Sequence, residues 1–201
     1  EVETNHLGNI GNCYFQMGNF DQAITTYENC LRGYQKAGNS LGEARTLIGV
    51  GSIHAATGDL SKAIKYFEES LAIAEIARET PLIANALLNL GGALNDKNNP
   101  KQALPTLEKA TELLIDNNNI LGTIQALNNL ATSYILLNKP KEAIRSLTMA
   151  LEKAKDLDAK RETAHILGNL GIILANLQKL DEAIQFLRES LEISTLIGES
   201  H

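Results

Sequence analysis

The chain has 201 residues, of which 44% are hydrophobic, and it carries a formal net charge of −6. This hydrophobic fraction is typical of a globular protein and argues against disorder. The negative charge argues against a nucleic-acid binder, which needs a concentrated basic surface. With no Trp and only 4% aromatic residues, the sequence supplies neither base-stacking platforms nor an aromatic belt for a membrane interface.

No hydrophobic run approaches the roughly 18 residues that a membrane span needs, and no secretory signal opens the chain. We therefore expect a cytoplasmic protein. Cys13 and Cys30 lack the spacing of a metal site or a disulfide framework, so free thiols are expected. Because the chain opens on Glu1 rather than methionine, we also expect it to be a piece of a longer protein.

The sequence repeats at an interval of forty residues. Leucine recurs at Leu7, Leu47, Leu87, Leu127 and Leu167, and alanine at Ala23, Ala63, Ala103, Ala143 and Ala183. A small residue recurs in the same way at Gly11, Gly51, Gly91, Ala131 and Gly171. Five repeats fill the chain without insertion, at 1–40, 41–80, 81–120, 121–160 and 161–201. This regularity predicts one repeat array over 1–201.

Each repeat predicts two helices, in chain order, separated by a turn. In the fourth repeat the first helix carries the amphipathic stripe Leu127, Leu130, Ala131 and Tyr134. Turn residues separate the two helices at Met17-Gly18-Asn19, Thr57-Gly58-Asp59, Asn98-Asn99-Pro100 and Asn138-Lys139-Pro140. Within them, N-caps are expected at Asn19, Asp59 and Asn99, and first helical positions at Pro100 and Pro140.

Two features concern the packing of these helices. The small residues at the Gly11 and Ala23 positions predict close approach of the paired helices. Pro105 lies several residues inside the second helix of the third repeat, where proline removes a backbone donor and clashes with the preceding turn. We expect a kink there or a helix that starts late.

The pattern resembles the tetratricopeptide repeat. The first repeat supplies its Gly11, Tyr14, Gly18, Ala23 and Tyr27, whereas Val50, His54 and Ser70 depart from the motif in the second. The resemblance implies an all-α fold, a right-handed superhelical solenoid of about ten antiparallel helices. The usual interval is about 34 residues. The forty-residue interval of this chain is longer, and in this respect the chain resembles Pins-type adaptors, kinesin light chains, bacterial peptide-sensing regulators and bacterial sensor arrays.

In the resembled family the first helices line the concave groove, so the polar stripe beside their packing face gives the candidate peptide-binding residues. They are Asn9, Asn12, Arg45, Asn85, Asn89, Gln125, Asn129, His165 and Asn169. A carboxamide both donates and accepts, so it can pair with one peptide unit of a ligand. Asn9, Asn89, Asn129 and Asn169 would form a ladder along the backbone of an extended peptide, a device that some tetratricopeptide proteins use. Gly49 interrupts this ladder in the second repeat.

Structural alternatives stay open for the same residues. The asparagines could hydrogen-bond a neighbouring repeat instead of a ligand. Arg45 could anchor a ligand carboxylate or pair with a groove acid such as Asp96. His165 fits a polar groove residue better than a switch, and His54 fits a structural role. Cys13 and Cys30 fall at packing positions, where cysteine acts as a small hydrophobe.

The sequence predicts a protein-interaction module that binds a protein or peptide partner, and no enzyme. It has no P-loop, no nucleophile elbow and no paired His at metal-ligand spacing, so neither a cofactor nor a metal is expected. No nucleic acid or membrane partner is expected either. The alternative is a spacer or self-association scaffold whose open ends dock on further repeats. Those ends would use the hydrophobic residues Leu7, Ile10, Leu187 and Leu191.

Overall fold

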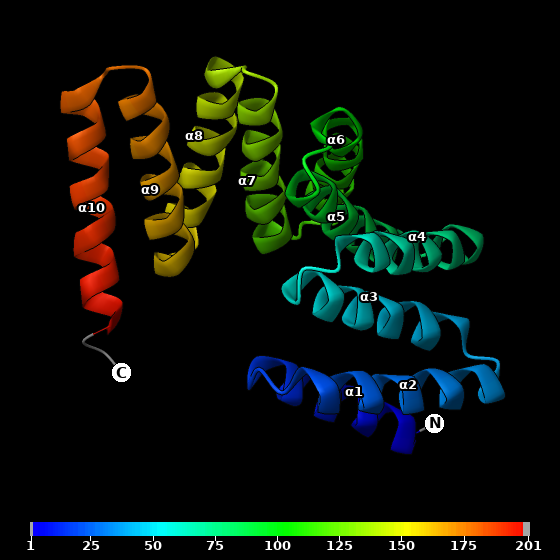
Figure 1. The fold of residues 1–201 in the computed structure, drawn as a ribbon. Coiled ribbons are helices and arrows are strands. Elements are labelled where there is room, and N and C mark those ends of the chain that lie inside the picture. The colour runs from blue at the N-terminus through cyan, green and yellow to red at the C-terminus, as the bar shows by residue number, and fades with distance from the viewer. Residues whose placement is uncertain (1, 199–201) are drawn as a thin grey trace. The chain divides into compact units, whose positions relative to one another are not determined.

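The computed structural model describes residues 2–198, and their side chains except those of residues 2, 3 and 5. In this described part the chain forms ten α-helices and no strand, as the sequence predicts (Figure 1). The helices are α1 Val2–Gln16, α2 Phe20–Ala37, α3 Ser40–Ala56, α4 Leu60–Ala77, α5 Thr80–Asp96, α6 Pro100–Asp116, α7 Ile120–Leu136, α8 Pro140–Asp156, α9 Lys160–Asn176 and α10 Leu180–Gly198.

A left-handed residue ends each helix from α1 to α9, at an interval of twenty residues. Glycine takes this conformation at Gly18, Gly38 and Gly58, and other residues take it at Arg78, Asn98, Asn118, Asn138, Asp158 and Gln178. Glycine and asparagine adopt the left-handed region at low cost, which stops a helix and reverses the chain. The sequence signal for the turns therefore persists where asparagine replaces glycine.

The helix starts agree in part with the predicted caps. Asp59 accepts a hydrogen bond from the backbone N–H of Lys62 at 3.2 Å, so it caps α4 as expected. Asn19 is the N-cap residue of α2, as expected, although its side chain makes no cap bond. Pro100 and Pro140 open α6 and α8, where the missing N–H costs nothing. Asn39 and Asn119 cap α3 and α7 through their side chains, although neither was predicted as a cap.

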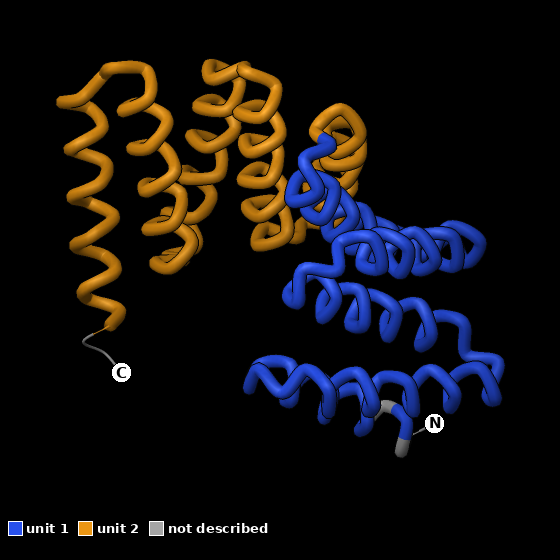
Figure 2. The backbone as a smooth tube through the Cα atoms, viewed as in Figure 1, with its two compact units in different colours: residues 1–99 blue, residues 100–201 orange. Residues whose placement is uncertain are grey.

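The chain divides into two compact units, Glu1–Asn99 and Pro100–His201 (Figure 2). In the first unit each helix packs on the next, and α3 also contacts α1 and α5. In the second unit the helices from α6 to α10 pack in succession. The prediction of one array over 1–201 stays a prediction.

Small residues let the two helices of a repeat approach closely, as expected. A Cβ atom added to Gly51 would lie 2.6 Å from Cε1 of Phe67, and one added to Gly11 would lie 3.0 Å from Cε1 of Tyr27. These rings therefore pack directly on the backbone of the first helix. The repeated alanines of the second helices, Ala23, Ala63, Ala103, Ala143 and Ala183, are all buried.

A side chain of the second helix also hydrogen-bonds a backbone carbonyl of the first in three repeats. In each case the donor lies 26 residues after the acceptor: Cys30 to Thr4 at 3.2 Å, Ser70 to Ala44 at 2.8 Å, and Ser190 to Ala164 at 2.7 Å. A buried hydroxyl needs such a partner. This bond explains why Ser70 stands at a packing position in place of alanine.

Pro105 lies inside α6, which runs without a break from Pro100 to Asp116. The predicted late start of this helix is therefore wrong. Proline still removes one backbone donor, so the turn around Pro105 lacks one helical hydrogen bond.

The two cysteines differ, although both are free. Cys30 is buried, as expected of a packing position, but Cys13 is exposed, so the prediction for Cys13 is wrong. The residue forty positions on, Ile53, is buried in a cluster with Tyr27 of the preceding helix. Cys13 is not covered in this way by any helix in the described part of the chain.

His54 stacks on Tyr66, which packs against the same cluster, as expected of a structural residue. Its ring stacks on Tyr66, with centroids 5.4 Å apart and planes 7° from parallel. Burial and the nearby charge of Lys62 lower the pKa of His54, and Asp59 opposes the shift. The neutral ring is therefore favoured in the folded protein.

Candidate binding groove on the first helices

In the first unit, α1, α3 and α5 line two adjoining hollows. One has a volume of about 550 Å³ and the other about 470 Å³. Arg45 and Ile48 of α3 line both, so the hollows meet at this helix. Volumes of this size match those of ordinary ligand pockets.

Five of the nine predicted residues line these two hollows. Asn9 and Asn12 of α1 lie in the first, Asn85 and Asn89 of α5 in the second, and Arg45 in both. The first helices therefore do bring the predicted carboxamides and the arginine to one surface of this unit.

Tyr27 explains why glycine interrupts the asparagine series at Gly49. A Cβ atom added to Gly49 would lie 2.8 Å from Cζ of Tyr27, so the ring occupies the space that an asparagine side chain would need. The Tyr27 hydroxyl donates a hydrogen bond of 2.5 Å to Oδ1 of Asn12. Burial, with a smaller effect of Cys30, raises the pKa of Tyr27, so this hydroxyl keeps its proton.

The other polar side chains that line these hollows differ in whether they already form hydrogen bonds or ion pairs within the protein. Asn89 donates from Nδ2 to the backbone carbonyl of Asn85 at 2.8 Å, which uses one of its two N–H groups. Asn9, Arg45 and Asn85 are exposed. No ion pair joins Arg45 to Asp96, or to any other acid in the described part of the chain. A ligand could therefore meet an unpaired guanidinium here.

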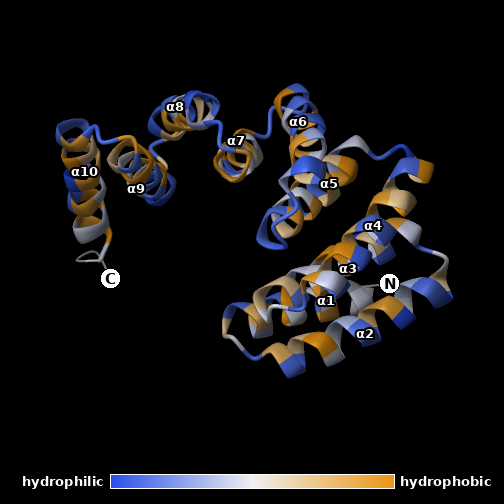
Figure 3. Ribbon diagram, turned by 45° about the horizontal axis from the view of Figure 1, so that its top comes forward, coloured by the Kyte–Doolittle hydropathy of each residue, from blue (hydrophilic) through white to orange (hydrophobic). Residues whose placement is uncertain are grey.

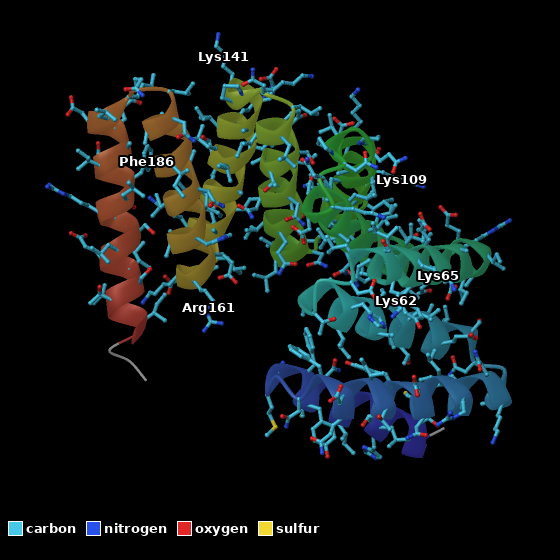
Figure 4. The ribbon with its side chains drawn as sticks, viewed as in Figure 1. Lys62, Lys65, Lys109, Lys141, Arg161 and Phe186 are labelled. Atoms are coloured by element: carbon cyan, nitrogen blue, oxygen red, sulfur yellow. The ribbon has the colours of Figure 1, made fainter. Side chains whose placement is uncertain are left out.

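A third hollow, of about 470 Å³, lies in the second unit between α9 and α10. His165 and Asn169 line it, together with Arg161 at the start of α9 (Figure 4). The lining of this hollow does not include the other two predicted residues of this unit, Gln125 and Asn129 on α7. Gln125 is exposed and Asn129 is half-buried.

Asn169 agrees with the alternative that an asparagine of this series hydrogen-bonds a neighbouring repeat instead of a ligand. Its Nδ2 donates a hydrogen bond of 2.9 Å to Oδ1 of Asn128, which lies on α7 in the preceding repeat. This bond joins the first helices of two repeats and is partly buried. The asparagine series is therefore mixed: Asn169 ties two repeats together, whereas Asn9 faces solvent.

A double-mutant cycle on Asn128→Ala and Asn169→Ala is expected to show a coupling of about 0.5–1.5 kcal/mol in the free energy of unfolding. The cycle cancels the gain in helix propensity that each Asn→Ala change brings. Urea denaturation of the parent, both single variants and the double variant measures this coupling. Additive effects would mean that the bond contributes nothing to stability.

Residues from second helices, which were not predicted, also line these hollows. Tyr27 and Tyr34 line the first hollow, and Ser190 and Ser194 line the hollow of the second unit. The signal that could have found the tyrosines is the pairing of a large ring with glycine. Tyr34 lies against Gly42 as Tyr27 lies against Gly49.

The outer side of the second helices is charged and solvated, as Lys62 and Lys65 on α4 illustrate (Figure 4). Lys62 pairs with Asp59 at 2.9 Å, and Lys65 with Glu69 at 3.7 Å. Among the described residues no group of three or more His, Cys, Asp or Glu is placed to hold a metal ion. None of the described helices is long and apolar enough to cross a membrane.

Comparison with solved structures finds the same fold in several proteins of low sequence identity. A Rap protein complexed with competence and sporulation factor is 17% identical, with a TM-score of 0.85 over 96% of this chain and 54% of its own. The apo form of RapI is 18% identical, with a TM-score of 0.84 over 98% of this chain and 72% of its own. The chain thus spans about half the length of that first Rap protein.

A Podosopora anserina protein, described as a kinesin light chain with nearly identical TPR-like repeats, matches over nearly its full length. It is 15% identical, with a TM-score of 0.78 over 98% of this chain and 97% of its own. Curated protein sequences gave no significant match. Models of the tetratricopeptide repeat match residues 2–76, 82–156 and 163–201. The chain therefore belongs to the tetratricopeptide repeat family.

Proposed function

We propose that the chain is a protein-interaction module and that its first unit binds an extended peptide segment of a partner. The observation that carries this proposal is the gathering of Asn9, Asn12, Arg45, Asn85 and Asn89 along two hollows that meet at Arg45. The carboxamides would pair with peptide groups of the ligand, and Arg45 would take a ligand carboxylate.

The chemistry of the two hollows favours a peptide over a small charged ligand. Apart from Arg45, the only charged residue that lines them is Glu79. Uncharged donors and acceptors suit the repeating C=O and N–H groups of a backbone, as in strand addition. Apolar and aromatic surface from the half-buried Ile48 and Phe15 is available beside them for ligand side chains.

The fold comparisons lend support. One similar structure is of a Rap protein complexed with competence and sporulation factor, so a protein that shares this fold is found with a bound factor. At 17% identity this likeness concerns the fold, and the partner of the present chain follows from its own groove chemistry.

The double variant Asn85→Ala/Asn89→Ala tests the proposal. Both side chains line the second hollow, Asn85 is exposed, and Asn89 bonds only within its own helix. We expect binding of hits from a fluorescent peptide library to weaken by about 1–3 kcal/mol, as for lost polar contacts. Fluorescence anisotropy measures the affinity, and thermal melts of both proteins should coincide or shift slightly upward.

Asn29→Ala is the matched control, because Asn29 is exposed on α2 and lines neither hollow. It should leave the affinity unchanged. Unchanged binding by the double variant, with hits that still bind the parent, would place the peptide elsewhere on the chain and refute the proposal.

A further inference from the structure

The second hollow of the first unit holds two opposite charges that the protein does not pair. Arg45 of α3 and Glu79, at the start of α5, both line it. The Arg45 side chain is exposed, and the Glu79 side chain is half-buried. No ion pair joins these two residues to each other or to any other residue in the described part of the chain. A ligand in this hollow therefore meets one free cation and one free carboxylate.

Glu79 stands at a position where other repeats cap a helix with asparagine. It is the N-cap residue of α5, as Asn39 and Asn119 are of α3 and α7. Each of those asparagines accepts a hydrogen bond from the backbone N–H three residues later, at 2.8 and 2.9 Å. The Glu79 side chain makes no such bond, and glutamate is not among the preferred N-cap residues. Capping of α5 therefore does not explain this carboxylate.

Both charges depart from the repeat. The residues at the position of Arg45 in the other repeats are three amides and a histidine, namely Asn5, Asn85, Gln125 and His165. The residues at the position of Glu79 elsewhere in the described chain are uncharged, namely Asn39, Asn119 and Ala159. Two separate departures from the repeat thus meet in one hollow, and they have opposite sign.

The rest of the hollow suits a peptide. Figure 3 shows hydrophobic residues among hydrophilic ones on α5. The half-buried Ile48 and the exposed Pro81 give the hollow apolar surface, and Asn85 and Asn89 add carboxamides that can pair with peptide groups. A bound peptide could therefore place an apolar side chain beside its charged groups.

We propose that the second hollow selects a peptide segment that carries both a basic group and a carboxylate. The basic group lies against Glu79 and the carboxylate against Arg45. This inference rests on the proposed peptide binding and adds the charge pattern of the ligand. A segment with both charges forms two charge-assisted hydrogen bonds, whereas a purely acidic segment also meets the like charge of Glu79. Glu79 therefore acts as a specificity residue.

Pools of fluorescent peptides test this charge pattern by anisotropy. All have acetylated N-termini and amidated C-termini, and they carry no charge, one lysine, one aspartate, or one of each at varied spacing. The pool with both charges should bind about tenfold more tightly than either single-charge pool. A further neutral pool with free termini distinguishes the source of the charges. Binding by that pool at the same strength would confirm the charge pattern and assign it to the two ends of a short peptide.

Glu79→Asn tests the contact with the basic group. Because asparagine caps α3 and α7 at the equivalent positions, this variant should melt no lower than the parent. It should weaken binding of the best two-charge peptide about tenfold, and it should not weaken binding of the analogue in which glutamine replaces the lysine. Glu68→Gln is the matched control. Glu68 is exposed on α4 and lines neither hollow, so its loss should change neither affinity.

Three outcomes would overturn the inference. A preference for the lysine-bearing peptide that survives in Glu79→Asn would assign the basic group to another residue. A lower melt with unchanged affinities would show that Glu79 acts only on the stability of α5. Equal binding of all capped pools, with the loss expected for Asn85→Ala/Asn89→Ala, would refute charge selection and leave peptide binding standing. Failure of the proposed function is distinct, because that double variant would then bind every pool as the parent does.

Discussion

Replacing Phe67 with alanine is expected to lower the free energy of unfolding by about 3–5 kcal/mol. Phe67 is 1% exposed, and its ring packs on the backbone of α3 at Gly51, which has no side chain of its own to fill the space that alanine would leave. The loss combines the lost burial of the ring with a cavity between α3 and α4. Urea denaturation followed by circular dichroism would measure it.

Phe67→Leu is the control, because leucine fills the equivalent position at Leu107 and Leu147. It should be much less destabilising than alanine. Gly51→Ala alone should cost about 1–3 kcal/mol through overpacking against the ring. In the Phe67→Ala background the same change should cost little or restore stability. Additive costs in the double variant would show that the ring and the glycine are not coupled.

Replacing Arg45 with glutamine is expected to weaken the binding of a carboxylate-bearing peptide by about 1.5–3 kcal/mol, the range for a charged hydrogen bond. This corresponds to a dissociation constant roughly ten- to hundredfold higher. Arg45 lines both hollows of the first unit, is exposed, and has no acid partner in the described part of the chain. Its loss should therefore leave the thermal melt unchanged.

The measurement compares each library hit with its carboxamide analogue, for the parent and for Arg45→Gln. The parent should prefer the carboxylate, and the variant should bind the two forms alike. Arg32→Gln removes the same charge from α2, where Arg32 bonds Asn29 at 2.6 Å, and should change neither affinity. A preference for the carboxylate that survives in Arg45→Gln would assign that contact to another residue.

The helices and turns were predictable because they depend on local rules repeated five times. A left-handed residue every twenty positions and small residues opposite large ones fix the two helices of each repeat. Five of the predicted peptide-binding residues line the hollows of the first unit, and their role in binding stays a prediction. The stripe on the first helices shows that Gly49 interrupts the asparagine series but not why, because the Tyr27 ring that excludes a side chain there comes from another helix.

By itself, the sequence determined the fold class, the repeat length and the helix pairs, since periodicity reports which side of a helix is buried. Only the tertiary structure decided how each polar group is used. Asn169 is joined to Asn128, Asn12 is held by Tyr27, and Arg45 is left unpaired, although all of these predicted residues share one stripe. The physical reason is that the spacing of residues in a helix fixes only the direction in which each side chain points from its own helix axis. A hydrogen bond depends in addition on the distances to side chains of other helices.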